Sequence, residues 1–129
     1  MASQLKARQA VIHLTHHALP QLRAAKRAAV INIASVSSKH THAGGAIYCA
    51  SKHALLGFSN CLFEDVRDEH IKVCAICPGY VATDMIKGVD VEMKKAIQPA
   101  DIAHTVLYVL DCGATACPTE IVVRPQQSM

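Results

Sequence analysis

The chain has 129 residues and a formal net charge of +3, from 13 Lys and Arg against 10 Asp and Glu. Hydrophobic residues make up 51% of it and charged residues 18%, which excludes a disordered chain. Its basic residues are scattered and its aromatic residues few, so we expect no nucleic-acid partner. It has no apolar run long enough for a membrane span and no signal-peptide core at its N-terminus. We therefore expect a cytoplasmic protein without a membrane partner.

The first half of the chain predicts a helix, a strand and a second helix. Residues 5–26 carry apolar side chains at helical spacing, with Pro20 expected to kink or shorten the helix. Residues 28–35, "AAVINIAS", are typical of a parallel strand buried on both faces. A polar loop at 36–46 leads to a long helix at 47–69. The expected inward stripe of that helix is Ala50, Ala54, Leu55, Phe58, Leu62 and Val66.

The second half predicts two more strands around a third helix. Residues 71–77, "IKVCAIC", indicate a second buried strand, and 80–97 a run of short helical turns. A helix at 99–111 begins with Pro99, and a third strand follows at 119–124. Alternating strands and helices predict an α/β fold with about three parallel strands, flanked by helices and joined by right-handed crossovers.

The polar groups that such a fold brings to one edge suggest acid–base chemistry. Ser35 ends the first strand, "CPGYVATDM" at 77–85 ends the second, and Tyr48 and Lys52 open the intervening helix. The carboxyl ends of parallel strands meet at one edge, where sites form. A lysine ammonium four residues after a tyrosine favours the phenolate, and Ser35 can hold a substrate oxygen against the Tyr48 hydroxyl. These residues predict general acid–base catalysis at that edge.

Together these motifs resemble a known family. "INIASVSS" at 31–38, "YCASK" at 48–52 and "CPGYVATDM" resemble the short-chain dehydrogenase/reductase superfamily. The resemblance extends from "AVIHLTHHALPQL" at 10–22 to "TEIVVRP" at 119–125. It implies a partial Rossmann-like three-layer fold. It also implies an NAD(P)-dependent oxidoreductase that transfers a hydride between a nicotinamide cofactor and a small-molecule alcohol or carbonyl substrate.

The resemblance also implies a role for each matching residue. Ser35 would polarise the substrate carbonyl or hydroxyl, Tyr48 would exchange the proton, and Lys52 would favour the phenolate and bind the nicotinamide ribose. Residues 84–97 would form a lid over the substrate. The residues expected against the nicotinamide end of NAD or NADP, besides Tyr48 and Lys52, are Pro78, Gly79, Val81 and Thr83.

The family's other half has no counterpart here. The six glycines, at positions 44, 45, 57, 79, 88 and 113, do not form the glycine-rich turn that holds a pyrophosphate. At the position where the family has an asparagine in the helix before the serine strand, this chain has Ala7. We expect residues 1–129 to be a single truncated domain, the C-terminal half, with weak or no activity alone. The strand at 28–35 would have a bare edge, which predicts poor solubility, oligomers or partial disorder.

Three alternatives remain open on the sequence. The first is structural zinc, but "CAIC" at 74–77 lies in a strand, where residues three apart point to opposite faces, so we expect no metal site. The second is a catalytically inactive dimerisation module that pairs through the helices at 5–26 and 47–69, which the family uses for homo-oligomers. The third is that the sequence is a fragment of a longer protein.

Overall fold

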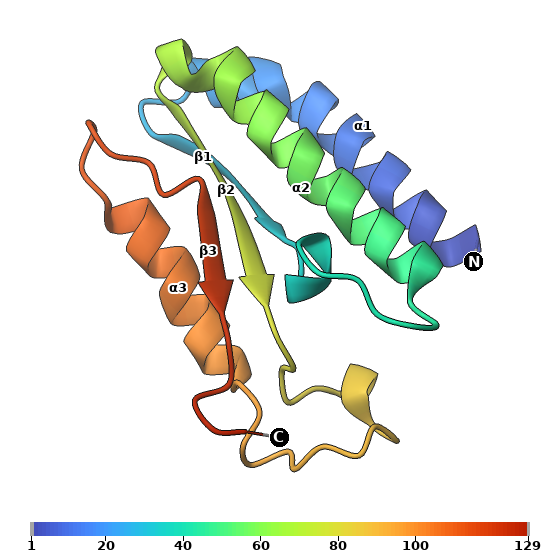
Figure 1. Ribbon diagram of the computed structural model, residues 1–129. Helices are drawn as coiled ribbons and strands as arrows, with labels where there is room; N and C mark the ends of the chain where they lie inside the picture. The colour runs from blue at the N-terminus through green and yellow to red at the C-terminus, as the bar shows by residue number, and fades with distance from the viewer. Residues whose placement is uncertain (1, 129) are drawn as a thin grey trace.

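Six main elements follow one another along the chain in this computed structural model (Figure 1). The structure describes residues 2–128, without the side chains of residues 2–5, 7 and 8. Position 7, where this chain has Ala7 and the family an asparagine, therefore lies outside the described side chains. Single 3-10 turns η1 (Val36–Ser38), η2 (Arg67–Glu69) and η3 (Asp84–Ile86) separate some of the elements. The main elements are α1 (Ala2–Ala24), β1 (Ala28–Ile33), α2 (Ala46–Val66), β2 (Ile71–Pro78), α3 (Pro99–Asp111) and β3 (Glu120–Val123).

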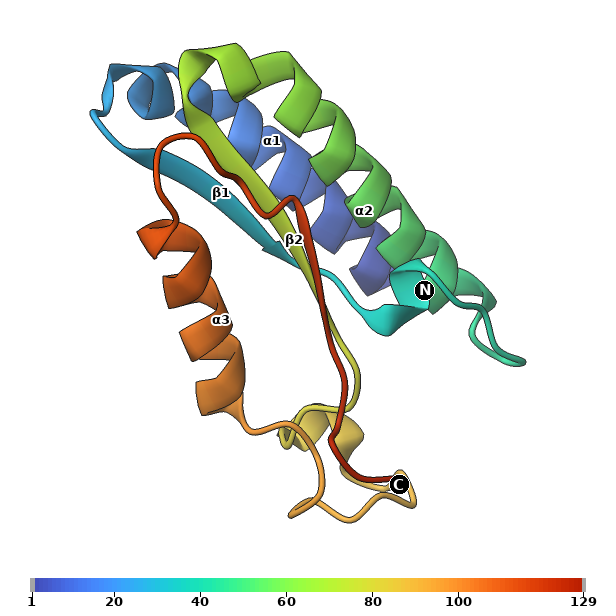
Figure 2. The ribbon, with the colours of Figure 1, turned by 60° about the vertical axis from the view of Figure 1, so that its left-hand side comes forward.

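The three strands form one parallel sheet in the order β1-β2-β3. In its register Val30 lies opposite Val73, and Cys77 lies opposite Val122. Helices α1 and α2 lie side by side on one face and α3 covers the other, which makes three layers (Figures 1 and 2). The predicted α/β fold with three parallel strands is confirmed, and in the described residues β1 has a strand on only one side.

Strand β2 is buried on both faces because it lies between the two helix layers. Val73 packs into a core with α2 side chains, and Cys77 into a second core on the same face. Cys74 and Ile76 pack with Val109 of α3 on the opposite face. The prediction that Cys74 and Cys77 point to opposite faces is therefore confirmed, and this alternation joins the layers around one strand.

The two crossovers have opposite hands, so the expectation of right-handed crossovers is wrong for one of them. Both connections step to the next strand in the same direction across the sheet. Their helices, α2 and α3, nevertheless lie on opposite faces (Figure 1). Right-handed connections dominate where a short crossover packs directly back onto its sheet. Here the long segment 79–98 carries the chain to the other face before α3 begins.

The helices differ from expectation in two details. Helix α1 continues through Pro20 to Ala24, so the proline does not end it. On α2, Ala50 and Ala54 are exposed, which corrects their place in the predicted inward stripe. The buried α2 residues are Cys49, Ser51, Ser59, Leu62 and Val66. Small polar side chains can occupy this face because they are hydrogen-bonded. Ser59 Oγ donates to the Leu55 carbonyl at 2.8 Å and accepts from Asn32 Nδ2 of β1 at 2.9 Å.

Helix α3 has the bounds that the sequence predicts. The Gln98 side chain and Asp101 form a reciprocal capping box, in which the Gln98 backbone N–H donates to Asp101 at 2.8 Å. Pro99 occupies the first turn, where its missing N–H does no harm. Among the described helices, none combines the length and apolar character needed to cross a membrane.

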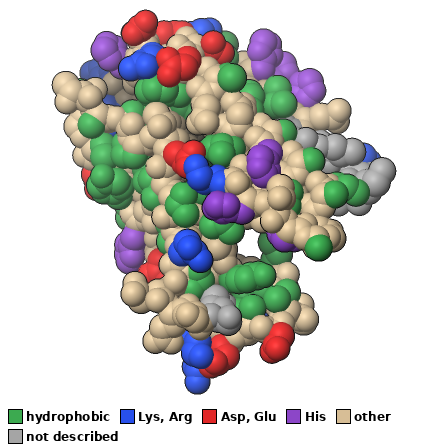
Figure 3. Space-filling view, viewed as in Figure 1, with side chains coloured by type: hydrophobic (Ala, Val, Ile, Leu, Met, Phe, Trp, Pro, Cys, Tyr) green, Lys and Arg blue, Asp and Glu red, His purple; other side chains and the backbone are tan. Residues whose placement is uncertain are grey.

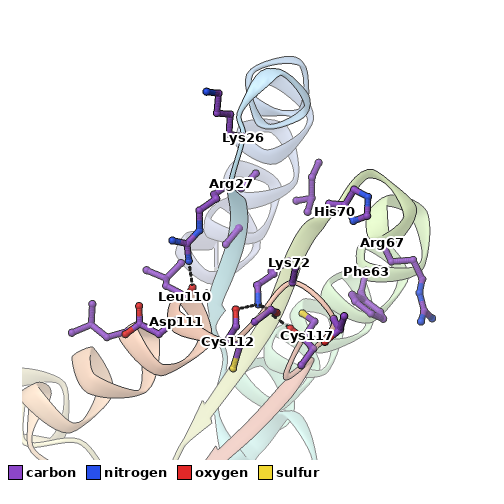
Figure 4. A pocket seen from close by; sticks show the side chains of 18 residues that line it. Lys26, Arg27, Phe63, Arg67, His70, Lys72, Leu110, Asp111, Cys112 and Cys117 are labelled. Carbon is purple, nitrogen blue, oxygen red and sulfur yellow. Dashed lines mark hydrogen bonds between the residues drawn. The ribbon is translucent and has the colours of Figure 1, made fainter.

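The end of α3 is held to the sheet by Lys72. Its ammonium donates to the carbonyls of Cys112 at 2.6 Å, Gly113 at 3.0 Å and Ala116 at 2.8 Å (Figure 4). Arg27 adds a bond from Nη2 to the Leu110 carbonyl at 2.8 Å. A cation is well placed there, since the last carbonyls of a helix carry its negative end. Lys72 thereby fixes the turn that leads into β3.

Replacing Lys72 with Met should destabilise the fold while keeping most of the apolar stem. Three carbonyls lose a charged donor, so we expect a loss of about 1 to 2 kcal/mol in the free energy of unfolding. Urea denaturation measures the change. Lys87→Met is the control, because Lys87 makes only an exposed ion pair with Asp84 and should leave stability nearly unchanged. Equal effects of the two substitutions would contradict the role of Lys72.

Candidate active site at the carboxyl edge of the sheet

Ser35 lies just beyond β1, at the start of the turn η1. The Ala34 N–H donates to the Ile76 carbonyl at 2.7 Å, which ties the end of β1 to β2. Ser35 is the N-cap of η1, and its Oγ accepts from the Ser37 N–H at 3.1 Å. The residue is only 7% exposed. Accepting this bond uses a lone pair of the oxygen, so the hydroxyl hydrogen remains available to donate to another group.

Tyr48 and Lys52 lie one turn apart near the start of α2. The Lys52 Nζ lies 5.8 Å from the centroid of the Tyr48 ring. The same ammonium donates to the Ile33 carbonyl at 3.2 Å. Lys52 therefore extends from α2 to the last residue of β1, two positions before Ser35. All three residues meet at the carboxyl edge, although within the described chain no hydrogen bond joins one of these side chains to another.

The half-buried position of Lys52 affects its protonation. Burial lowers the pKa of Lys52 below 10.5, and the Cys77 thiol opposes this shift more weakly. Within the described part of the chain, the Lys52 ammonium has one hydrogen-bond partner, the Ile33 carbonyl. A partly desolvated cation with one acceptor is poised to bind a further hydroxyl or phenolate oxygen.

Two buried groups behind Ser35 were missed by the sequence reasoning. The Cys77 thiol is fully buried, and burial raises its pKa, while the Ser35 backbone N–H and the Ser38 hydroxyl favour the thiolate. Ser38 Oγ is buried and has no regular hydrogen-bond partner among the residues that the structure describes. For Ser38, the available signal in the sequence was its place in the serine-rich stretch "SVSS". The Ile33 carbonyl, which accepts from Lys52, could not be predicted, since every residue has a carbonyl.

The other predicted cofactor-contacting residues lie at the end of β2 and just after it. Pro78 is buried at the end of the strand, and the Gly79 N–H donates to the Val123 carbonyl at 2.8 Å. Val81 forms a parallel bridge with Ile97, and Thr83 is exposed. The structure places these residues in one segment beyond the carboxyl edge, next to the strand end that precedes Ser35.

The cysteines and histidines form no metal cluster. Among the described residues, no group of three or more His, Cys, Asp and Glu side chains is arranged to hold an ion. All six cysteines are free, and only Cys49, Cys74 and Cys77 are buried. Cys112 and Cys117 are half-buried, and Cys61 is exposed.

The motif pattern and this geometry agree with a family comparison. The model of the short chain dehydrogenase family matches residues 7–94, which is more than half of the chain. The chain belongs to the short-chain dehydrogenase family. The family resemblance predicted from the sequence motifs is thus confirmed.

Curated relatives match the chain with about one third identity. An oxidoreductase of Staphylococcus haemolyticus is 34% identical over 107 residues, which are 83% of this chain and 46% of that protein. The human 3-oxoacyl-[acyl-carrier-protein] reductase is 34% identical over 89 residues, or 64% of this chain and 38% of the reductase. The chain spans half or less of the length of these relatives.

Solved structures share the same fold. A betaketoacyl-[ACP] reductase from Bacteroides thetaiotaomicron is 29% identical with a TM-score of 0.73, covering 87% of this chain and 46% of its own. Serine dehydrogenase from Escherichia coli is 26% identical with a TM-score of 0.76, covering 94% of this chain and 51% of its own. A closed form of serine dehydrogenase was solved with NADP+. The Rossmann-like architecture is therefore that of the family.

Replacing Lys52 with Met should stabilise the fold at neutral pH, because it removes a half-buried charge. In the unmodified chain, stability should rise as pH increases toward 10.5, since the folded state releases the Lys52 proton before the unfolded state does. The variant should lose that rise. Urea denaturation at neutral pH, near pH 10.5 and above it measures both effects and covers the control described next.

The control for this prediction is Lys39→Met. An ion pair with Glu120 raises the pKa of Lys39, so its contribution is present below 10.5 and is lost as pH rises through the raised pKa. The unmodified chain should lose stability through Lys39 at alkaline pH, and the Lys39 variant should not show that fall. For Lys52 the variant instead lacks a rise in stability. A Lys52 variant that is less stable than the unmodified chain at neutral pH would refute the burial argument.

Proposed function

We propose that this chain carries the acid–base centre of an NAD(P)-dependent oxidoreductase acting on an alcohol or carbonyl. The observation that supports it most is the Lys52 ammonium, placed between the Tyr48 ring and the Ile33 carbonyl, beside Ser35. The family relationship adds independent support, since relatives are named as oxidoreductases and reductases.

Each side chain has a distinct part in the proposed reaction. The Ser35 hydroxyl donates to the substrate oxygen and orients it. The Tyr48 hydroxyl gives a proton to that oxygen during reduction and takes one from it during oxidation. The Lys52 ammonium stabilises the phenolate that forms. The nicotinamide cofactor, when bound, accepts or supplies the hydride.

The described residues fit one end of the cofactor. Lys52 offers an ammonium to ribose hydroxyls, and the exposed Thr83 offers a hydroxyl beside the nicotinamide end. Glycine at position 79 is explained by packing rather than by a cofactor contact, because a Cβ there would lie 3.0 Å from Pro125 Cδ. The sequence has no glycine-rich turn for the pyrophosphate. Binding of NAD or NADP is supported by the similar structure of serine dehydrogenase, which was solved with NADP+.

We also propose that the chain forms homo-oligomers through the exposed sides of α1 and α2. These two helices pack against each other and share one face of the sheet (Figure 1). Apolar Ile12 and Leu14 of α1 are exposed. On α2 the exposed residues include Ala50, Ala54 and Gly57, which would let a second helix approach closely.

Tyr48→Phe should abolish carbonyl reduction when this chain is fused to the N-terminal half of a full-length relative. Loss of the proton donor should lower kcat by about 100-fold to 10,000-fold. NAD(P)H oxidation against a panel of carbonyls measures the rate. Tyr108→Phe is the matched control, because Tyr108 is exposed on α3 and should leave the rate unchanged. An unchanged rate for Tyr48→Phe would remove Tyr48 from the mechanism.

Gly57→Arg should shift the chain toward the monomer. A Cβ at Gly57 meets no atom within 4 Å in the single chain, so folding tolerates the larger side chain. In an α2-mediated oligomer the arginine would meet the partner helix. Size-exclusion chromatography with light scattering measures the mass, and Gly57→Ala is the control that should keep it. The same oligomer for both variants would exclude this helix face as the interface.

A further inference from the structure

Helix α1 presents a pair of histidines on the side that faces away from the sheet. On its inner side Thr15 is buried, and Leu19 and Leu22 pack on the core. His13 comes two residues before Thr15 and His17 two residues after it. With about 3.6 residues per turn, the two histidines flank the point opposite Thr15. Both are exposed, and histidine side chains gather at the upper right of the space-filling view, over the pair of helices α1 and α2 (Figure 3).

The spacing of the pair suits a shared ligand. Side chains four residues apart on a helix are neighbours, with Cβ atoms about 5–6 Å apart. The helix is continuous on both sides of the pair, over Ala2–Ala24. Among the described residues, the histidine rings with a hydrogen bond are those of His42 and His53. The ring nitrogens of His13 and His17 therefore have no hydrogen-bond partner there and are open to a ligand.

The chemistry of the pair favours one class of ion. Residues 9–21 of α1 contain no Asp, Glu, Lys or Arg, so imidazole nitrogens are the strongest ligands on this part of the helix. Imidazole suits Ni²⁺, Cu²⁺ and Zn²⁺, whereas Mg²⁺ and Ca²⁺ take oxygen ligands. Two imidazoles do not enclose an ion, which agrees with the absence of a group of three or more ligands among the described residues. Water would therefore fill the other coordination positions.

We propose that His13 and His17 chelate one divalent transition-metal ion at the surface of α1. The ions of this class are Ni²⁺, Cu²⁺ and Zn²⁺, and Cu²⁺ binds most tightly to nitrogen ligands. His16 is not a ligand, because adjacent residues on a helix do not face a common point. Its ring instead lies edge to face against His17, with centroids 5.5 Å apart. The site is separate from the candidate active site, and the inference does not depend on the proposed reaction.

The test follows the histidine ring signals of the full 129-residue chain by NMR. The chain is labelled with 13C in its eight histidine rings and titrated with NiCl2, and MgCl2 serves as the ion of the wrong class. Bound Ni²⁺ is paramagnetic and broadens the ring signals of its ligands, so metal held by the free cysteines is not mistaken for this site. The signals of His13 and His17 should broaden first and together. Mg²⁺ should leave them unchanged.

Substitutions separate chelation from binding by a single histidine. His13→Gln and His17→Gln should each weaken Ni²⁺ binding by about tenfold to 100-fold, because a lone imidazole lacks a second ligand held beside it. His104→Gln is the matched control and should leave binding unchanged, since His104 is exposed on α3 with no histidine four residues away. Adding Gln9→His to His17→Gln rebuilds a pair four residues apart and should restore binding.

Each outcome bears on the metal site alone. Early broadening confined to the two rings, lost in either single variant and regained with the rebuilt pair, would support the chelate. Equal broadening of all exposed histidines, an unchanged affinity in His13→Gln, or no recovery with the rebuilt pair would overturn it. All the substituted positions are exposed, and circular dichroism checks that the variants keep their helices. The ring signals need no hydride transfer, so a failure of NAD(P)H oxidation counts only against the proposed reaction.

Discussion

The burial of β2 on both faces determines the rest of this structure. A strand with apolar residues on both sides needs a layer of helices on each face, because either face left in water would lose the free energy of burial. The α2 layer meets Val73 and Cys77, and the α3 layer meets Cys74 and Ile76. Both β1 and β3 pair with this same strand. Every layer of the fold is therefore positioned by eight consecutive residues, Ile71–Pro78.

The candidate site follows from the way that β1 is aligned with this central strand. The bond from Ala34 to Ile76 fixes the end of β1, which places both the Ile33 carbonyl and Ser35. Helix α2 then returns across the same face and brings Lys52 against that carbonyl. Burial lowers the pKa of the Lys52 ammonium, so we expect the protonated side chain to reduce stability at neutral pH.

The sequence predicted what depends on local pattern. The three strands, the bounds of α3 and the opposite faces of Cys74 and Cys77 follow from alternation, apolar runs and capping residues. It failed for the hand of one crossover, which depends on where the chain passes after 79. It also failed for Ala50 and Ala54 of α2, because the packing of that helix on the sheet leaves them exposed. The contacts of Lys52 and Lys72 were also unpredictable, since their acceptors are backbone carbonyls. The roles of Ser35, Tyr48 and Lys52 stay predictions.

The long connection from β2 to β3 has a consequence for the order of folding. Residues 79–119 separate the two strands, whereas residues 34–70 between β1 and β2 are mostly helical. Joining the ends of an irregular segment has an entropic cost that a packed helix reduces. We expect the β1–α2–β2 unit to form first and β3 to join the sheet last. Amide protons of β3 should accordingly exchange through small local openings, while those of β2 require global unfolding.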